Sequence, residues 1–239
     1  MDWFSFIVAG VMVYVAVAIF IGGSIYRIIK WRRTPKNPVR QGMFPQPGSA
    51  AVRALKMGKD SLIFPQVLET DRWMWFFVIG MHLAGIGLFI GHLRLLFEFT
   101  PIYNAVGTDS MEKMAAWVGG AIGITLFIAF TYFLLRRFKS PYRELSIPED
   151  YLLLLLILLL VLLGDHLRFT HPFELSAYRD YIASLLAFKP HFPADIADSS
   201  AKWVLVGHVF TANLLLIYFP FSKLVHSIGG FAGNLLRSE

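Results

Sequence analysis

Apolar and polar stretches alternate along the chain, and five apolar runs stand out. Four of the runs are long enough to cross a bilayer as helices: residues 3–26, 73–93, 114–135 and 203–221. A transmembrane helix needs about 20 mainly apolar residues. A fifth run, 151–164, has only 14 residues and is extended by Leu167 and Phe169. The pattern predicts an all-α membrane protein, a bundle of five transmembrane helices.

The run boundaries predict one membrane domain over residues 1–239. The expected spans are about 3–30, 72–97, 113–137, 149–169 and 201–227. The last span is expected to run to His226 as one continuous helix. The connection 31–71 is longer than a connector requires, which predicts either docking of a cytoplasmic partner or disorder, with a short interfacial helix within 50–67. The connection 170–200 contains LSAYRDYIASLLAF, which could lie as a helix on the membrane surface.

Composition supports a membrane protein and narrows the chemistry. The chain is 56% hydrophobic and 16% charged, against about 25% charged residues in a soluble domain. It contains no cysteine, which excludes disulfides and thiolate-bound iron–sulfur clusters from this chain and leaves histidine as the metal ligand to consider.

The distribution of lysine and arginine predicts the orientation. Ten lie between spans one and two, four between spans three and four, and two at the C-terminal end, which is 16 of the 22 in the chain. The opposite connections hold the other six. The positive-inside rule then places the N-terminus outside and the C-terminus in the cytoplasm. Topology explains the net charge of +6 without nucleic acid, and lipid recognition is the other use of such basic loops.

Four histidines lie inside the predicted spans, two on each of two helices. His82 and His92 belong to the second span, and His208 and His226 to the fifth. Ionisable residues at membrane depth are costly and mark function by default. One such histidine is commonly a hydrogen-bonded residue of the bundle. Two on each of two helices favour haem, because histidines from two helices can fill both axial positions of the iron. We interpret the four as ligands of two haems stacked across the membrane.

The spacing and direction of the two helices give the pairing. Eighteen residues separate His208 from His226, about 27 Å and five full turns, so both rings would leave one side of a continuous helix. Ten residues separate His82 from His92, about 15 Å and about 80° around the helix. Because the spans are antiparallel, His82 pairs with His226 at an inner haem and His92 with His208 at an outer haem. The unequal steps require tilted helices or slanted haems.

Glycines stand close to the histidines in both spans: Gly80, Gly85, Gly91 and Gly207. A glycine lets helices separate or approach around a flat cofactor without a clashing Cβ. Ordinary close packing of helices explains the same glycines.

Longer motifs surround these residues: GMHLAGIGLFIGHL, EKMAAWVGGAIG and GHVFTANLLLIYFPFSKLVH. Together with the two spacings they resemble the dihaem cytochrome b of respiratory nitrate reductase, its gamma subunit, over more than half of the chain. The resemblance implies a multi-pass protein of the cytoplasmic membrane, with quinol oxidised near the outer haem and electrons delivered inward to a cytoplasmic iron–sulfur subunit. It also implies axial ligation of two haem b irons by His82, His92, His208 and His226.

The proline-bearing connection 31–71 and the GDHLRFTHPF stretch depart from the nitrate reductase pattern. They look more like the membrane cytochromes of the sulfite-reductase-associated Dsr complex and of heterodisulfide-reductase-like complexes. This branch implies exchange of electrons with menaquinone and menaquinol. Its cytoplasmic partner resembles the catalytic iron–sulfur subunit of heterodisulfide reductase, and further membrane and periplasmic cytochrome subunits belong to such complexes. Dissimilatory sulfur metabolism is then the expected context, with a nitrate reductase gamma subunit as the alternative.

Four polar residues at the outer side predict a quinol site. His166 would accept a proton from quinol, since histidine titrates near neutral pH. Asp165 would orient its ring, and Lys113 or Arg168 would donate a hydrogen bond to the quinol oxygen. A solvated end of the fourth span explains the same residues.

Two other classes of function remain open at this point. A haem-free transporter would use the histidines as a proton relay, although the chain shows no internal repeat of the kind common in transporters. A structural anchor for a partner complex would explain the loops but leaves four histidines at membrane depth without a purpose. In the favoured interpretation the chain is the electron-transfer subunit of an oxidoreductase complex.

Overall fold

The computed structural model describes residues 2–33, 49–170, 174–193 and 201–230. Every regular element within these ranges is a helix, which confirms the predicted all-α class. Five helical segments are long and apolar enough to cross a membrane: Trp3–Arg33, Arg72–Leu93, Thr108–Arg136, Pro148–Thr170 and Ala201–Phe221. The number of spans was therefore predicted correctly, and the chain is a membrane protein.

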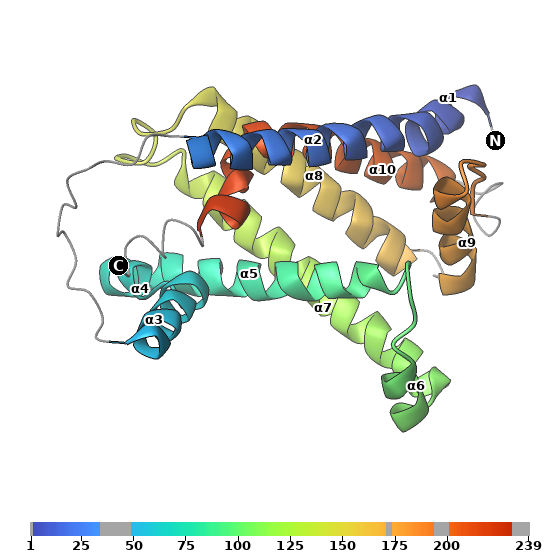
Figure 1. The fold of residues 1–239 in the computed structure, drawn as a ribbon, viewed down its shortest axis with the longest axis horizontal. Helices are drawn as coiled ribbons and strands as arrows, with labels where there is room; N and C mark the ends of the chain where they lie inside the picture. The colour runs from blue at the N-terminus through green and yellow to red at the C-terminus, as the bar shows by residue number, and fades with distance from the viewer. Residues whose placement is uncertain (1, 34–48, 171–173, 194–200, 231–239) are drawn as a thin grey trace. The chain divides into compact units, whose positions relative to one another are not determined.

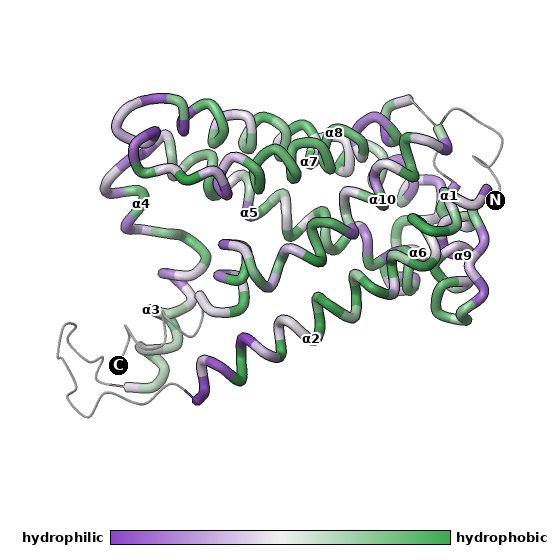
Figure 2. The backbone as a smooth tube through the Cα atoms, turned by 90° about the horizontal axis from the view of Figure 1, so that it is seen from above, coloured by the Kyte–Doolittle hydropathy of each residue, from purple (hydrophilic) through white to green (hydrophobic). Residues whose placement is uncertain are grey.

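The faces of these helices are covered with large apolar side chains that the protein itself does not bury. Trp117 is 82% exposed, Phe89 66% and Leu83 65%. Apolar residues run along the helices, and polar residues collect at their ends, as at the C-terminal end of α2 (Met12–Arg33) (Figure 2). Side chains of this kind need lipid or partner helices around them.

The helices are connected by shorter elements. α3 (Ala50–Leu62) and α4 (Pro65–Thr70) follow the first span, and α6 (Thr100–Val106) and α9 (Leu175–Leu186) lie in the later connections. Helices thus occur where the sequence allowed them at 50–67 and in LSAYRDYIASLLAF. Helix α7 (Thr108–Arg136) begins earlier than expected. Part of each long predicted connection, at 34–48, 171–173 and 194–200, lies outside the described residues.

The contacts of the chain form two compact units. Unit 1 comprises Met1–Ala16 and Gly80–Leu215, and unit 2 comprises Val17–Ile79 and Leu216–Glu239. Each unit is described by itself.

In unit 1 the N-terminal segment is joined through its backbone carbonyls to two later helices, Leu175–Leu186 and Ala201–Tyr218. The first span starts as α1 (Trp3–Phe6) and passes through a π-helix, η1 (Ile7–Val11). The Val8 carbonyl accepts a hydrogen bond from Asn213 Nδ2 (3.0 Å). The Ala9 carbonyl accepts one from the Tyr181 hydroxyl (2.6 Å), and burial raises the pKa of that phenol far above its usual range. α1 and α9 lie at the same end of unit 1 (Figure 1). A buried apolar cluster includes residues of both segments that these bonds join: Val8, Ala9, Tyr178, Tyr181, Leu185, Phe192, Leu205 and Val206.

Small residues bring α7 and α8 (Pro148–Thr170) together in unit 1. Gly119, Gly120 and Gly123 recur at the spacing of one helix face. A Cβ built at Gly120 would lie 3.0 Å from the ring of Phe169, and one at Gly123 would collide with the Asp165 carboxylate. The end of α8 therefore packs directly on the backbone of α7.

Unit 2 contains a similar close approach between α2 and η2 (Phe219–Phe221). The Arg27 Nε donates a 2.7 Å hydrogen bond to the Pro220 carbonyl. A Cβ built at Gly23 would lie 2.8 Å from two ring atoms of Pro220. Only a glycine fits at this position against a rigid, fully buried proline ring.

The prediction that the fifth span continues as one helix to His226 is wrong. Helix α10 (Ala201–Tyr218) gives way to the 3₁₀ turn η2, then to an extended Ser222, and then to a second 3₁₀ turn, η3 (Lys223–Val225). Pro220 explains the break, because it lacks the N–H that an α-helix requires and its ring clashes with the preceding turn. His208 and His226 therefore do not share one helix face, and the 27 Å estimate does not apply.

Two neighbouring glycines of α2 test the contact with Pro220. We expect Gly23→Ala to lower the free energy of unfolding by about 1–3 kcal/mol, since the methyl group overpacks against a ring that cannot rotate away. Gly22→Ala is the matched control, because nothing lies within 4 Å of its Cβ position. Alanine there should raise the stability by about 0.5–1 kcal/mol through its helix propensity. Thermal unfolding of the purified variants in detergent measures both, and equal shifts would contradict the contact.

Candidate haem-binding site

The four predicted ligands lie on three elements. His82 and His92 are on α5 (Arg72–Leu93), His208 is on α10, and His226 directly follows η3. His82, His92 and His208 belong to unit 1, and His226 belongs to unit 2. His92 and His208 therefore lie in the same unit, while His82 and His226 lie in different units and their pairing stays a prediction.

The His208 ring is fixed on the backbone of α8. Its Nδ1 lies 3.2 Å from the Leu160 carbonyl oxygen. A carbonyl only accepts hydrogen bonds, so Nδ1 carries the proton and Nε2 keeps its lone pair. The ring can come this close because residue 164 is a glycine: a Cβ there would lie 3.1 Å from His208 Cε1 and 3.5 Å from Nδ1.

His92 and His226 show the same arrangement with carbonyls of their own segments. His92 Nδ1 lies 2.9 Å from the Leu88 carbonyl oxygen, and His226 Nδ1 lies 2.8 Å from that of Lys223. In His92 and His208 Nε2 is thus the nitrogen available to a metal. A hydrogen bond from the other ring nitrogen is the usual way in which proteins orient a histidine ligand and select its tautomer.

The His92 and His208 rings lie close enough for a charge on one to act on the other. The described part of the chain contains no group of three or more histidine or acidic side chains that could hold a bare metal ion. Two imidazoles with Nε2 available are the ligands that a haem iron requires, since the porphyrin supplies the remaining ligands. The chemistry of His92 and His208 therefore suits an axial pair for haem b, and their pairing stays a prediction.

The glycine that positions a ligand is not one of those singled out from the sequence. Cβ positions at Gly85 and Gly91 meet nothing within 4 Å, and those at Gly80 and Gly207 meet only ordinary contacts. Gly164 makes the close contact, although it is on a helix that carries no predicted ligand. The only sequence signal for it was a glycine in an otherwise leucine-rich span, and spacing within one helix cannot report a contact with another.

The four residues predicted to bind quinol have separate surroundings. The Asp165 carboxylate lies against Gly123 of α7, and Arg168 Nε lies 3.5 Å from a Cβ built at Gly119. His166, about 100° further around α8 from Asp165, is exposed. Lys113 Nζ makes a 2.7 Å ion pair with Asp109 on the exposed surface of α7. Asp165 thus packs on a neighbouring helix instead of orienting the His166 ring, because successive residues of a helix point in different directions.

A polar cluster that the sequence did not predict lies just beyond His92. Arg94 Nη2 donates to the Tyr103 hydroxyl (2.5 Å) and to the Glu112 carboxylate (2.6 Å), and the Tyr103 hydroxyl donates to the same carboxylate (2.9 Å). Arg179 Nε of α9 donates to the Arg94 carbonyl (2.8 Å). The turn after α5, with α6, α7 and α9, builds this cluster from residues far apart in the sequence.

Comparisons with known proteins identify the family. The nitrate reductase gamma subunit family matches residues 65–237. The chain belongs to this family. It is 29% identical to the Hdr-like menaquinol oxidoreductase cytochrome b-like subunit of Archaeoglobus fulgidus, over 94% of this chain and 77% of the relative. It is 27% identical to the protein of the same name from Archaeoglobus profundus, over 90% and 74%. It is 26% identical to the nitrate reductase gamma chain of Bacillus subtilis, over 91% and 88%.

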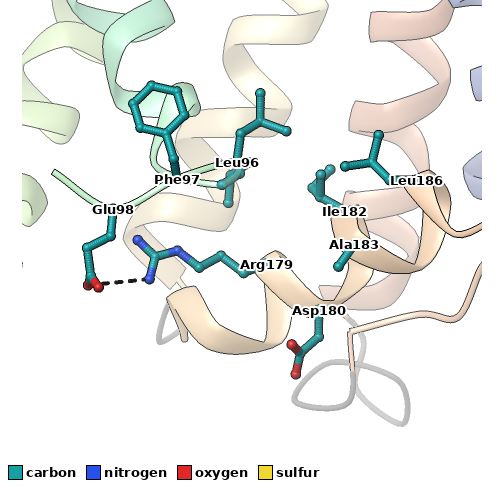
Figure 3. Close-up of a pocket in the computed structure, with 9 residues that line it drawn as sticks. Leu96, Phe97, Glu98, Arg179, Asp180, Ile182, Ala183 and Leu186 are labelled. Atoms are coloured by element: carbon teal, nitrogen blue, oxygen red, sulfur yellow. Dashed lines mark hydrogen bonds and ion pairs between the residues drawn. The ribbon is translucent and has the colours of Figure 1, made fainter. Parts of the chain in front are cut away.

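This member of the gamma-subunit family also has a pocket of about 310 Å³ beside the polar cluster. Figure 3 shows Arg179 at its edge, facing Glu98, with an Nη1 to Oε1 distance of 3.5 Å. Its walls are mostly apolar and come from the turn after α5 and from α9: Leu95, Leu96, Phe97, Glu98, Arg179, Asp180, Ile182, Ala183 and Leu186. None of the eight residues predicted to bind haem or quinol lines it.

Substitution of Gly164 tests its role in positioning His208. We expect Gly164→Val to displace the ring from the Leu160 carbonyl, so that the purified protein loses the haem predicted at His92 and His208 and retains the one predicted at His82 and His226. Gly207→Ala is the control, because its Cβ would meet Leu163 at an ordinary 3.5 Å. The haem content, measured as pyridine haemochrome per chain, decides between them. Full haem content in Gly164→Val would exclude a positioning role for this glycine.

Proposed function

We propose that the chain is the membrane cytochrome b subunit of a respiratory complex that exchanges electrons between menaquinol and a cytoplasmic iron–sulfur subunit. The observation that carries the proposal is the state of the histidine rings in a member of this family. His92 and His208 each direct Nδ1 to a carbonyl, which leaves Nε2 for iron, and His226 also directs Nδ1 to a carbonyl. The name of the two archaeal relatives suggests the reaction, menaquinol oxidoreduction.

Two haem b groups would be held across the membrane. His92 and His208 are proposed as the ligands of the outer haem, and His82 and His226 as those of the inner haem. Bound haem supplies one-electron redox chemistry that no side chain of this chain offers. The chain's own part is to present neutral imidazoles in a fixed orientation, which the carbonyl bonds and the Gly164 contact support.

Quinol oxidation releases two electrons and two protons, and the protons need an acceptor with a route to water. We propose that His166 accepts a proton at the outer side, since it is an exposed histidine at the end of α8. Lys113 or Arg168 is proposed as the hydrogen-bond donor to the quinol oxygen. Asp165 is at the same end of α8, and its carboxylate packs on α7. This site would serve menaquinol at the outer haem.

The orientation and the partner follow from the basic connections. Sixteen of the 22 lysines and arginines fall on the side proposed to be cytoplasmic, in a protein of the cytoplasmic membrane. The connection 31–71, with α3 and α4, is the proposed docking segment for an iron–sulfur partner like the catalytic subunit of heterodisulfide reductase. Further membrane and periplasmic cytochrome subunits and a role in dissimilatory sulfur metabolism belong to the same proposal, and nucleic acid has no part in it.

A role as the gamma subunit of a nitrate reductase is the second candidate. The Bacillus subtilis relative carries that name, and so does a chain of Escherichia coli that is 28% identical over 61% of this chain. Both candidates use the same haem ligands and differ in the cytoplasmic partner. Copurification of partner subunits from native membranes distinguishes them.

Single-ligand variants test the haem pairing. We expect His92→Ala and His208→Ala to lose one and the same haem, and His82→Ala and His226→Ala to lose the other, because each iron loses an axial ligand. His191→Ala is the control, since His191 is exposed and outside the spans. Dithionite-reduced spectra and haem content per chain provide the readout. A colourless, folded wild-type protein would favour the haem-free anchor or transporter, and a haem shared by His82 and His92 would refute the pairing.

The quinol site is tested through haem reduction. Replacing His166 with Phe should slow reduction by a menaquinol analogue by about 100-fold, which is typical for loss of a general base. Both haems should remain bound, because His166 is exposed and is not one of the four proposed ligands. Stopped-flow absorbance of the reduced haem measures the rate. Wild-type kinetics in a variant with full haem content would move the quinol site elsewhere.

A further inference from the structure

The polar cluster beyond His92 contains a buried arginine, which is rare in membrane proteins. Arg94 is only 8% exposed. One of its nitrogens, Nη2, satisfies both Tyr103 and Glu112, while its carbonyl accepts from Arg179. Burial of a guanidinium is costly unless charges and hydrogen bonds compensate it. The compensation seen within the described residues is incomplete.

Two N–H groups of the cluster are buried without an acceptor among the described residues, Arg94 Nε and Arg179 Nη2. Buried donors are nearly always hydrogen-bonded, so each such group calls for an explanation. Arg94 pairs with Glu112 and Arg179 with Glu98, and Arg168 lies within range of the charges of Arg94 and Glu112. The cluster thus has two buried donors, beside its ion pairs, that can bind a further carboxylate.

Two arginines of the cluster lie a short way along the chain from residues of the predicted haem site in unit 1. Arg94 follows His92 by two residues, about 3 Å along the axis. Arg168 follows Gly164, the residue that touches His208, by one turn, about 6 Å. Arg168 also lies within range of the charges of Arg94 and Glu112. Both arginines are therefore displaced from the level of the two imidazoles toward the same end of the unit.

We propose that Arg94, supported by Arg168 and Arg179, binds a propionate carboxylate of the haem held by His92 and His208. Haem b carries two propionates at one edge of the macrocycle, so a group bound between the two imidazoles would extend its acidic edge a few ångströms to one side. A guanidinium matches a carboxylate in shape and charge. The inference rests on the proposed function, since it requires that this histidine pair binds haem.

The cluster also has a packing role, which must be separated from the proposed one. Through Tyr103 and Glu112, Arg94 ties the turn after α5 to α6 and α7. A pure packing role would affect stability or haem content when Arg94 is changed. A bound propionate would in addition link these charges to the iron, because positive charge nearby favours the ferrous over the ferric state.

The sign of the shift in midpoint potential provides the test. In purified two-haem protein, Arg94→Gln should lower the midpoint potential of the haem lost in the His92 and His208 variants. Glu112→Gln removes the opposing negative charge and should raise it. The second haem should keep its potential in both variants. Lys189→Gln, which removes an exposed charge of the same unit, is the matched control and should shift neither haem.

Resonance Raman spectra of the propionate bending modes add a direct readout, since they shift when a hydrogen bond to the carboxylate is lost. If Arg94→Gln fails to fold, Arg179→Gln takes its place and should lower the same potential. Unchanged potentials and propionate bands in folded Arg94→Gln or Arg179→Gln would reduce the cluster to packing alone. A wild-type protein without haem would instead refute the proposed function, so the two failures are distinguishable.

Discussion

A histidine ring inside a membrane helix carries a proton on one nitrogen, and in hydrocarbon that proton needs an acceptor. For His92, His208 and His226 the acceptor is a backbone carbonyl. His92 and His226 use carbonyls of their own segments, and His208 uses the Leu160 carbonyl of a neighbouring helix. The chemistry of the proposed haem sites depends on this bond, since it selects the tautomer and points Nε2 away from the helix that accepts the proton.

The same demand for satisfied backbone groups shapes unit 1. Carbonyls near the π-helix accept bonds from Asn213 and Tyr181, and the Leu185 carbonyl accepts one from the Tyr14 hydroxyl (2.7 Å). Glycines allow side chains to reach the backbone of a neighbouring helix, as Gly164 does for His208. Packing and hydrogen bonding therefore act together to hold α8 and α10 at the distance that the imidazole requires.

The length of the apolar runs predicted the helical class and all five spans, because long apolar runs have few other stable forms in a bilayer. It failed where a single residue changes the backbone, as at Pro220, whose missing N–H ends α10 before His226. The histidines of the candidate site were visible in the sequence since they are rare at membrane depth. The Gly164 contact was not, because it joins two helices. The cluster of Arg94, Tyr103 and Glu112 was missed for a related reason: its geometry is set by a connection whose path the pattern of hydrophobicity does not encode.

Because α10 ends at Tyr218, the orientation of the His208 ring and that of the His226 ring are set by different backbone segments. In an unbroken helix, adding or removing one residue between them would rotate one ring by about 100° relative to the other. Here the extended Ser222 interrupts the helix, so the rotation is not passed along the backbone. A change of length at Ser222 would leave the bond between His208 and the Leu160 carbonyl in place. The two halves of the segment can therefore vary in sequence and length with little effect on one another, and the geometry around one histidine does not dictate that around the other.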